Sequence, residues 1–165
     1  MIRFMYAACF GICILLTFPI QAQNLFYCGP SGGAGGETFV DDAIPKNSRV
    51  YEIQIFAGEY IDAIRLVHEN DRGELLELRK HGGSGGRPTI ITLAPDEYLI
   101  AIEGQHNKFV HALRFYTNKR TTEWYGSRDG KYTFKYEAPE GYEIVGLNGR
   151  SGWYLDALGV LFRRR

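Results

Sequence analysis

The stretch that decides the fold is Gly152-Trp153-Tyr154-Leu155-Asp156-Ala157-Leu158-Gly159-Val160, because the chain contains two further copies of its pattern. One copy is Gly58-Glu59-Tyr60-Ile61-Asp62-Ala63-Ile64-Arg65-Leu66, and the other is Asn107-Lys108-Phe109-Val110-His111-Ala112-Leu113-Arg114-Phe115. In each copy an aromatic residue is followed by an aliphatic residue, a polar residue, alanine and a second aliphatic residue. The polar residues, Asp62, His111 and Asp156, are 49 and then 45 positions apart. This recurrence predicts three equivalent units.

Glycine-rich loops repeat in step with these motifs. The loop Gly32-Gly33-Ala34-Gly35-Gly36 returns as Gly82-Gly83-Ser84-Gly85-Gly86, and in altered form as Gly126-Ser127-Arg128-Asp129-Gly130. Asp62 precedes the second loop and His111 precedes the third, whereas Asp156 has no loop after it and the first loop has no such residue before it. Asp156 can therefore lie beside a glycine loop only if the last unit is next to the first. We therefore expect both ends of the domain to pair in one sheet, which also removes exposed sheet edges.

The composition indicates an all-β fold, with 20 glycines, 11 tyrosines and 10 phenylalanines and short apolar runs between turn residues. Alternation over Val50 to Phe56 places Tyr51, Ile53 and Ile55 on one face. Further strands are predicted at Thr89 to Leu93, Tyr98 to Glu103, Phe109 to Tyr116 and Tyr132 to Tyr136. A helix is an alternative for Glu59 to Asn70, but the repeat favours a strand there.

The first 22 residues are typical of a secretory signal peptide. Arg3 is their only charge, an apolar run extends from Phe4 to Phe18, and Ile20-Gln21-Ala22 offers a small residue for cleavage. A retained N-terminal anchor is the alternative, although the run is short for a span of about 20 residues. The remaining residues, 23–165, contain no second such run and are expected to form one secreted domain.

Charge and cysteine content limit the partners. The chain has 19 Lys+Arg and 19 Asp+Glu, and removing residues 1–22 with Arg3 leaves 18 against 19, a balance that argues against nucleic acid. The basic Arg163-Arg164-Arg165 is interpreted as a solvated tail, with an anionic-glycan or phospholipid patch as the alternative. Cys28 is alone in the mature chain, so it is either a free thiol or a link within a homodimer.

The repeated features suit the recognition of a sugar. A carboxylate accepts charge-assisted hydrogen bonds from two neighbouring hydroxyls, and paired glycines let backbone amides turn toward a ligand. Asp156 with loop 32–36 and Asp62 with loop 82–86 supply both, although a purely structural repeat remains an alternative. We expect Tyr154 and Tyr60 to form a rim and Trp153 to add a face for C–H stacking. The third unit has His111 in place of a carboxylate and is predicted to be vestigial.

These residues resemble a known family. Gly-Pro-Ser-Gly-Gly-Ala-Gly-Gly at 29–36, Phe-Tyr-Thr-Asn-Lys at 115–119 and the run from Gly149 to Val160 are similar to jacalin-related lectins, over essentially all of residues 27–162. The resemblance implies a β-prism I fold, in which three four-stranded Greek-key sheets surround a pseudo-threefold axis. It also implies ligand loops at one end, with no metal, no cofactor and no catalysis.

The resemblance also assigns binding residues. The family's first carbohydrate site corresponds to Gly36, Trp153, Tyr154 and Asp156. Mannose-binding members of the banana-lectin type have a second site, which corresponds to Glu59, Tyr60, Asp62, Gly85 and Gly86. Galactose-preferring members carry a proteolytic cut at the position of Gly36, whereas Gly35-Gly36-Glu37 looks uncut, so mannose or glucose is favoured. Val40-Asp41-Asp42 and the bulky Trp153 depart from the usual pattern.

Four alternatives remain open from the sequence. Asp62 and Asp156 would form a glycosidase pair only if their carboxyl groups were about 5–10 Å apart, and we expect a larger separation in different units. The domain is otherwise a galactose-type or anionic-glycan lectin, or a protein-interaction module that has lost sugar binding. A β-trefoil is the competing threefold fold. The partners expected on this interpretation are mannose- or glucose-type glycans and glycoproteins.

Overall fold

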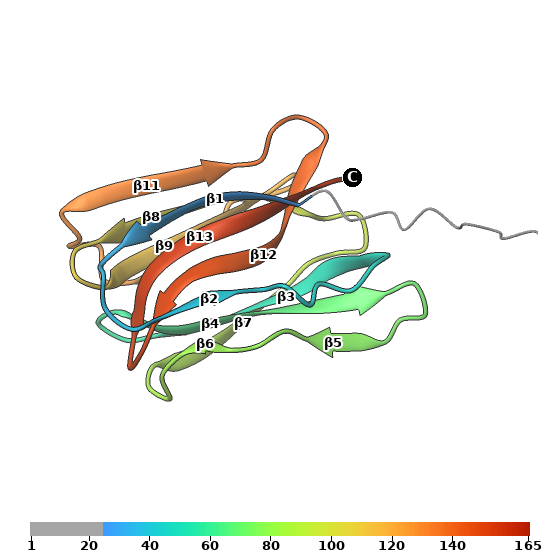
Figure 1. Cartoon of the computed structure of the whole chain (residues 1–165). Helices are drawn as coiled ribbons and strands as arrows, with labels where there is room; N and C mark the ends of the chain where they lie inside the picture. The colour runs from blue at the N-terminus through green and yellow to red at the C-terminus, as the bar shows by residue number, and fades with distance from the viewer. Residues whose placement is uncertain (1–24) are drawn as a thin grey trace, which may run out of the picture.

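The computed structural model describes residues 25–165, and this part of the chain is built of strands without helices (Figure 1). Thirteen strands form three antiparallel sheets. The predicted signal peptide, residues 1–22, lies outside the described residues. Within residues 25–165, no helix has the length and apolar character that a membrane crossing requires.

The first sheet contains both ends of the described chain. Its order is β1 (Leu25–Gly32), β13 (Leu155–Arg164), β12 (Tyr142–Ser151) and β2 (Glu37–Val40). Leu25 is paired with Arg163 at one end of the β1–β13 ladder, and Gly32 with Ala157 at the other. The predicted pairing of the last unit with the first segment is therefore confirmed.

The second sheet carries the unit of Asp62. Its order is β5 (Leu75–Glu77), β4 (Ile61–Asn70), β3 (Ser48–Ala57) and β7 (Arg87–Thr92), with β6 (His81–Gly82) also paired to β4. The segment for which a helix was an alternative is thus the strand β4, as the repeat predicts. Three strands linked in sequence and a fourth that returns beside the first make a Greek key.

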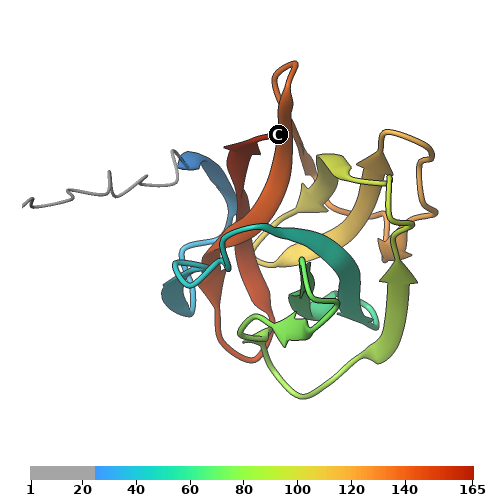
Figure 2. The same ribbon diagram turned by 90° about the vertical axis from the view of Figure 1, so that its right-hand side faces the viewer.

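The third sheet has the order β10 (Tyr125–Gly126), β9 (Val110–Thr117), β8 (Leu99–His106) and β11 (Tyr132–Glu137). The three sheets differ mainly in their outer strand, which is continuous as β1, divided into β5 and β6, and reduced to β10 beside a Tyr116–Thr121 bridge. The arrangement confirms the three-sheet prism and is not a β-trefoil. Figure 2 shows the sheets around a common interior, viewed from the end that carries the C-terminus.

The inner faces of all three sheets supply the core. Its large, fully buried side chains include Ile53, Ile64, Leu99, Leu113, Ile144 and Leu147. One strand departs from the predicted alternation, because β3 contains a bulge between Val50 and Glu52 where its register against β4 shifts. Val50 therefore packs in the core at 2% exposure and Tyr51 is only half-buried. The expectation that Tyr51 shares the inner face of Ile53 and Ile55 is wrong for this reason.

A buried histidine lies opposite this bulge. His68 is fully buried, with its Nε2 donating to the Val145 carbonyl over 2.8 Å and its Nδ1 2.8 Å from the Ser48 hydroxyl. Burial lowers the pKa of His68 from 6.5 to about 4. The folded protein holds this imidazole neutral, so stability falls as the pH drops from 6.5 toward 4.

Candidate functional site

The three glycine loops lie beside the three polar residues, as the repeat predicts. In each unit the second residue of the loop donates its backbone N–H to the carbonyl oxygen of the polar residue on the neighbouring strand. These bonds are Gly33 to Asp156 at 2.8 Å, Gly83 to Asp62 at 3.0 Å and Ser127 to His111 at 3.0 Å. The same hydrogen bond in three sheets places three equivalent positions around the pseudo-threefold axis.

Site 1, defined by Gly35, Gly36 and Asp156, joins β13 to the loop between β1 and β2. Asp156 is 4% exposed. A Cβ atom on Gly35 would lie 2.3 Å from Asp156 Oδ1, and one on Gly36 would lie 2.6 Å from Oδ2. Gly36 also has φ +62°, which disfavours other residues. The two glycines thus keep the positions beside both carboxylate oxygens free of side-chain atoms.

Site 2, defined by Gly85, Gly86 and Asp62, repeats this geometry at β4. Asp62 is 8% exposed. A Cβ atom on Gly85 would lie 2.3 Å from Asp62 Oδ1, and one on Gly86, at φ +78°, would lie 2.8 Å from Oδ2. The agreement with site 1 to within 0.2 Å shows that the two sites are built in the same way.

Both carboxylates are nearly buried without a cationic partner. Among residues 25–165, neither Asp62 nor Asp156 belongs to an ion pair or accepts a side-chain hydrogen bond. Burial raises the pKa of each carboxyl group. At Asp62 its own backbone N–H and that of Gly58 offset this in part, and at Asp156 the backbone N–H of Gly152 and the charges of Arg150 and Lys108 do so. An unpaired charge in such a place is costly to the fold, and perturbed carboxyl groups of this kind are typical of functional sites.

The third unit, defined by His111, Ser127 and Asp129, is different. His111 Nδ1 lies 2.7 Å from Asp129 Oδ1, and the Ser127 hydroxyl donates to the same oxygen over 2.6 Å. The hydrogen bond with His111, followed by that from Ser127, lowers the pKa of Asp129. The acid of this unit is therefore held by its own loop and strand.

The aromatic residues of the three repeats pack against each other. The rings of Tyr60, Phe109 and Tyr154 have centroids 5.0–5.6 Å apart in all three pairs. Tyr60 also contacts the edge of the His111 ring at 4.7 Å. Equivalent side chains of a threefold repeat thus converge on its axis, and the role of Tyr154 and Tyr60 as a rim for a sugar stays a prediction.

The turns before the polar residues interlock with the neighbouring loops. A Cβ atom on Gly33 would lie 2.0 Å from the Lys108 carbonyl oxygen, and one on Gly83 would lie 2.2 Å from that of Trp153. The indole of Trp153 is 84% exposed, and the carboxylate of Glu59 raises the pKa of the Tyr60 hydroxyl beside it. The first two glycine loops are thus each packed against the turn of a neighbouring unit.

Residues 28–161 match the family model of the jacalin-like lectin domain. The chain belongs to the jacalin-like lectin family. It is 37% identical over 148 residues to Jacalin-related lectin 19 of Arabidopsis thaliana, covering 84% of this chain and 80% of that protein. Two further relatives are longer: this chain spans 45% of the agglutinin of Castanea crenata and 22% of Jacalin-related lectin 3 of Arabidopsis thaliana.

Solved structures agree with this family. Wild-type Malaysian banana lectin is similar with a TM-score of 0.74 and 28% identity, over 85% of this chain and 99% of that one. A mannose binding jacalin related lectin from Ananas comosus is similar with a TM-score of 0.73 and 30% identity, over 86% and 99%. The jacalin-like domain therefore has the β-prism fold and the carbohydrate-binding character of a lectin, as its resemblance implies.

Two residues near site 1 of this jacalin-like domain escaped the sequence analysis. Arg150 donates from Nε to the Gly35 carbonyl and from Nη2 to the Gly36 carbonyl, each over 2.7 Å. Phe56 and Gln105 occupy its position in the other units. Lys108 is the second missed residue. Both could have been found in the sequence by aligning the three repeats. Arg150 lies six residues before Asp156, and Lys108 lies three residues before His111.

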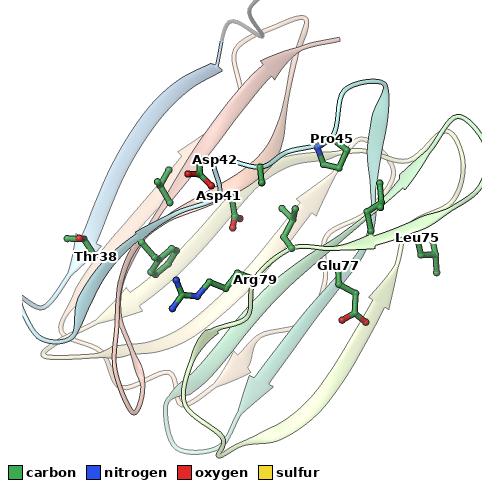
Figure 3. Close-up of a pocket in the computed structure, with 12 residues that line it drawn as sticks. Thr38, Asp41, Asp42, Pro45, Leu75, Glu77 and Arg79 are labelled. Atoms are coloured by element: carbon green, nitrogen blue, oxygen red, sulfur yellow. The ribbon is translucent and has the colours of Figure 1, made fainter.

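A separate groove lies on the side of the jacalin-like domain between two sheet edges. It has a volume of about 590 Å³ and is lined by residues from Thr38 to Pro45 and from Leu75 to Arg79 (Figure 3). None of the predicted site residues lines it. Asp41 in its wall accepts hydrogen bonds from His81 Nε2 at 2.8 Å and from the Leu147 N–H at 2.9 Å. The unusual Val40-Asp41-Asp42 therefore has a structural role, linking the first sheet to the base of the second glycine loop.

No three residues among His, Cys, Asp and Glu gather in a manner that would hold a metal ion within residues 25–165. Asp62 and Asp156 stand on different sheets, each with its own loop. The geometry of each site is that of an acceptor with few internal donors beside two glycines, which suits a ligand rich in hydroxyl groups.

Proposed function

We propose that this protein is a lectin that binds mannose- or glucose-type glycans through site 1 and site 2 without a metal ion. The observation that carries this proposal is a nearly buried carboxylate that belongs to no ion pair among residues 25–165, faces two glycines and occurs twice. The hydroxyls of a bound sugar would donate to the carboxylate oxygens and replace the hydrogen bonds lost by burial. The remaining site residues, Trp153, Tyr154, Glu59 and Tyr60, would border the sugar.

The choice of mannose or glucose rests on two supports. One similar solved structure is described as a mannose binding lectin. In addition, the chain runs unbroken through Gly35, Gly36 and Glu37, whereas galactose preference in this family depends on a new amino terminus at the position of Gly36. A glycan array with neutral and acidic glycans tests this choice against the galactose-type and anionic-glycan alternatives.

The central experiment is calorimetry with methyl α-mannopyranoside. The wild type should show two sites per chain, and Asp62→Asn and Asp156→Asn should each leave one. The double variant should lose at least about thirtyfold in affinity, because two charge-assisted hydrogen bonds at about 1.5–3 kcal/mol each are weakened. Asp71→Asn, at an exposed acid outside both sites, is the matched control.

Four outcomes would contradict the proposal or a part of it. Unchanged binding by the double variant would show that the sugar is held elsewhere, and binding that disappears in EDTA would show that a metal is needed. If no array glycan binds above background, the fold serves as a protein-interaction module instead. Hydrolysis of the glycans during incubation would contradict the non-enzymatic role that we propose.

We further propose that the protein acts outside the cell after removal of residues 1–22. Mass determination of the amino terminus of the secreted protein tests this, since cleavage should expose Gln23. Two sites per chain would allow cross-linking of branched glycans, and a homodimer would have four. Sedimentation with and without a reductant would reveal a dimer and any contribution from the exposed Cys28.

A further inference from the structure

The two sites differ in the charges that border them. At site 1 the neighbouring turn contributes Lys108, whose carbonyl contacts Gly33, and the strand before Asp156 contributes Arg150. At site 2 the corresponding residues are Trp153 and Phe56, and its own turn contributes Glu59. Site 1 is thus bordered by two cations in positions where site 2 has aromatic residues.

Lys108 is available to a ligand. It is exposed, and within residues 25–165 it has no carboxylate within ion-pair distance. Its Nζ lies 5.4 Å from the centre of the Phe109 ring, which packs against Tyr154 of site 1 at 5.0 Å. At site 2, Lys80 has its Nζ closer to an aromatic ring, 4.6 Å from the centre of the Phe56 ring.

The fields at the two carboxylates agree with this placement. The charges of Arg150 and then Lys108 lower the pKa of Asp156, partly opposing the effect of burial. The pKa of Asp62 responds to burial and backbone hydrogen bonds. The residue that follows each loop has a charge of the other sign, an acid, Glu37, at site 1 and a base, Arg87, at site 2. Neither of them shifts the pKa of the aspartate in its site.

We propose that site 1, unlike site 2, selects glycans with a negatively charged saccharide next to the sugar held by Asp156, and that Lys108 determines this selectivity. The inference rests on the proposed sugar binding. The charge belongs on the adjacent saccharide, because an anionic group on the held sugar itself would be repelled by the Asp156 carboxylate. Arg150 is occupied by two carbonyl oxygens, so it adds to the field while Lys108 is free to pair with the anion.

The test uses a matched pair of disaccharides, mannosyl-(1→4)-glucuronic acid and mannosyl-(1→4)-glucose, which differ in one carboxylate. Calorimetry on Asp62→Asn reports site 1, and calorimetry on Asp156→Asn reports site 2. At low ionic strength site 1 should bind the acidic disaccharide about threefold more tightly than the neutral one, as expected of one exposed ion pair. Site 2 should show no preference for the acid. The preference should shrink as salt shortens the Debye length from about 30 Å at 0.01 M to about 3 Å at 1 M.

Lys108→Gln in the Asp62→Asn background should abolish the preference and keep the affinity for the neutral disaccharide. Lys131→Gln, which removes another exposed lysine near Tyr132, is the matched control and should keep the preference. Equal binding of the two disaccharides at site 1, or a preference that survives Lys108→Gln, overturns this proposal alone. If no variant binds the neutral disaccharide, the mannose proposal is wrong. If no variant binds either disaccharide, the mannose proposal and the proposal for Lys108 are both wrong.

Discussion

Site 2 and the third unit place their carboxylate on opposite partners of the strand and loop pair. In site 2 the carboxylate belongs to the strand, as Asp62, and the loop supplies Gly85. In the third unit the strand supplies His111 and the loop supplies the carboxylate, as Asp129. Burial raises the pKa of Asp62, whereas the hydrogen bond from His111 lowers that of Asp129. An acid that has an internal partner stabilises the fold, and an acid without one is left for a ligand.

The loop sequences explain why the carboxylate lies on the strand in one unit and on the loop in the other. Gly33 and Gly83 pack so tightly on the neighbouring turn that a Cβ atom would lie 2.0–2.2 Å from a carbonyl oxygen. Ser127 has a Cβ atom at this position, so the third loop cannot approach its neighbour in the same way. Gly35 and Gly85 have no room for a side chain beside the aspartate, and Asp129 is tolerated only because His111 has replaced that aspartate.

The largest effect should come from giving site 2 a side chain. In the Asp156→Asn background, Gly85→Ala would place a Cβ atom 2.3 Å from Asp62 Oδ1 and should reduce affinity for methyl α-mannopyranoside at least about thirtyfold. Gly58→Ala is the matched control, because its Cβ atom would lie at an ordinary 3.5 Å from Asp62 Oδ2. Calorimetry on both variants, with circular dichroism to verify folding, makes the comparison. Equal affinities would mean that the carboxylate is not the sugar-binding group.

The reverse change should create a third site. His111→Asp together with Ser127→Gly, Arg128→Ser and Asp129→Gly reproduces the residues of site 2. We expect the number of sites per chain to rise from two to three, with an affinity within about tenfold of site 2, because the backbone hydrogen bond from residue 127 to residue 111 is already present. His111→Asp alone, with Asp129 retained, should not create a site, since two carboxylates would repel each other. A folded quadruple variant with two sites would show that further residues are required.

Acid should produce a smaller, graded effect. The carboxylates of Asp62 and Asp156 must be ionised to accept two hydroxyl hydrogen bonds, so binding should weaken as the pH falls, beginning above the ordinary aspartate value of 3.8. Since the ligand favours the ionised form, binding in this range should release protons. Calorimetry between pH 7 and 4 in buffers of different ionisation enthalpy measures this release. Proton uptake on binding would contradict the assignment.

The stability of the free protein should change in the opposite sense at the two kinds of acid. A raised pKa means that ionising Asp62 or Asp156 costs stability as the pH rises, so Asn at either position should not lower Tm at neutral pH. The stabilisation by Asp129, whose pKa is lowered, is lost as the pH falls through that pKa. His68 destabilises the fold between pH 6.5 and 4, so the folded fraction must be measured at each pH alongside binding.

The sequence predicts much of this arrangement, since glycines and aspartates in register constrain the backbone directly. The loop-to-strand pairing at Asp62 and Asp156 and the closure of the ring follow from order and spacing alone. Details that depend on contacts between units cannot be predicted from order and spacing. The bulge at Tyr51, the convergence of Tyr60, Phe109 and Tyr154, and the position of Lys108 beside Gly33 each require knowledge of which turn lies against which loop.

The pairing of β1 with β13 also places the C-terminus at the end of the domain far from site 1. Leu25 and Arg163 are partners at one end of this ladder, while Gly32 and Ala157, beside site 1, are partners at the other. Six residue steps along β13, at about 3.3 Å each, separate these ends by about 20 Å. A surface or a fusion partner attached after Arg163 would therefore leave the glycine loop of site 1 accessible to ligands in solution.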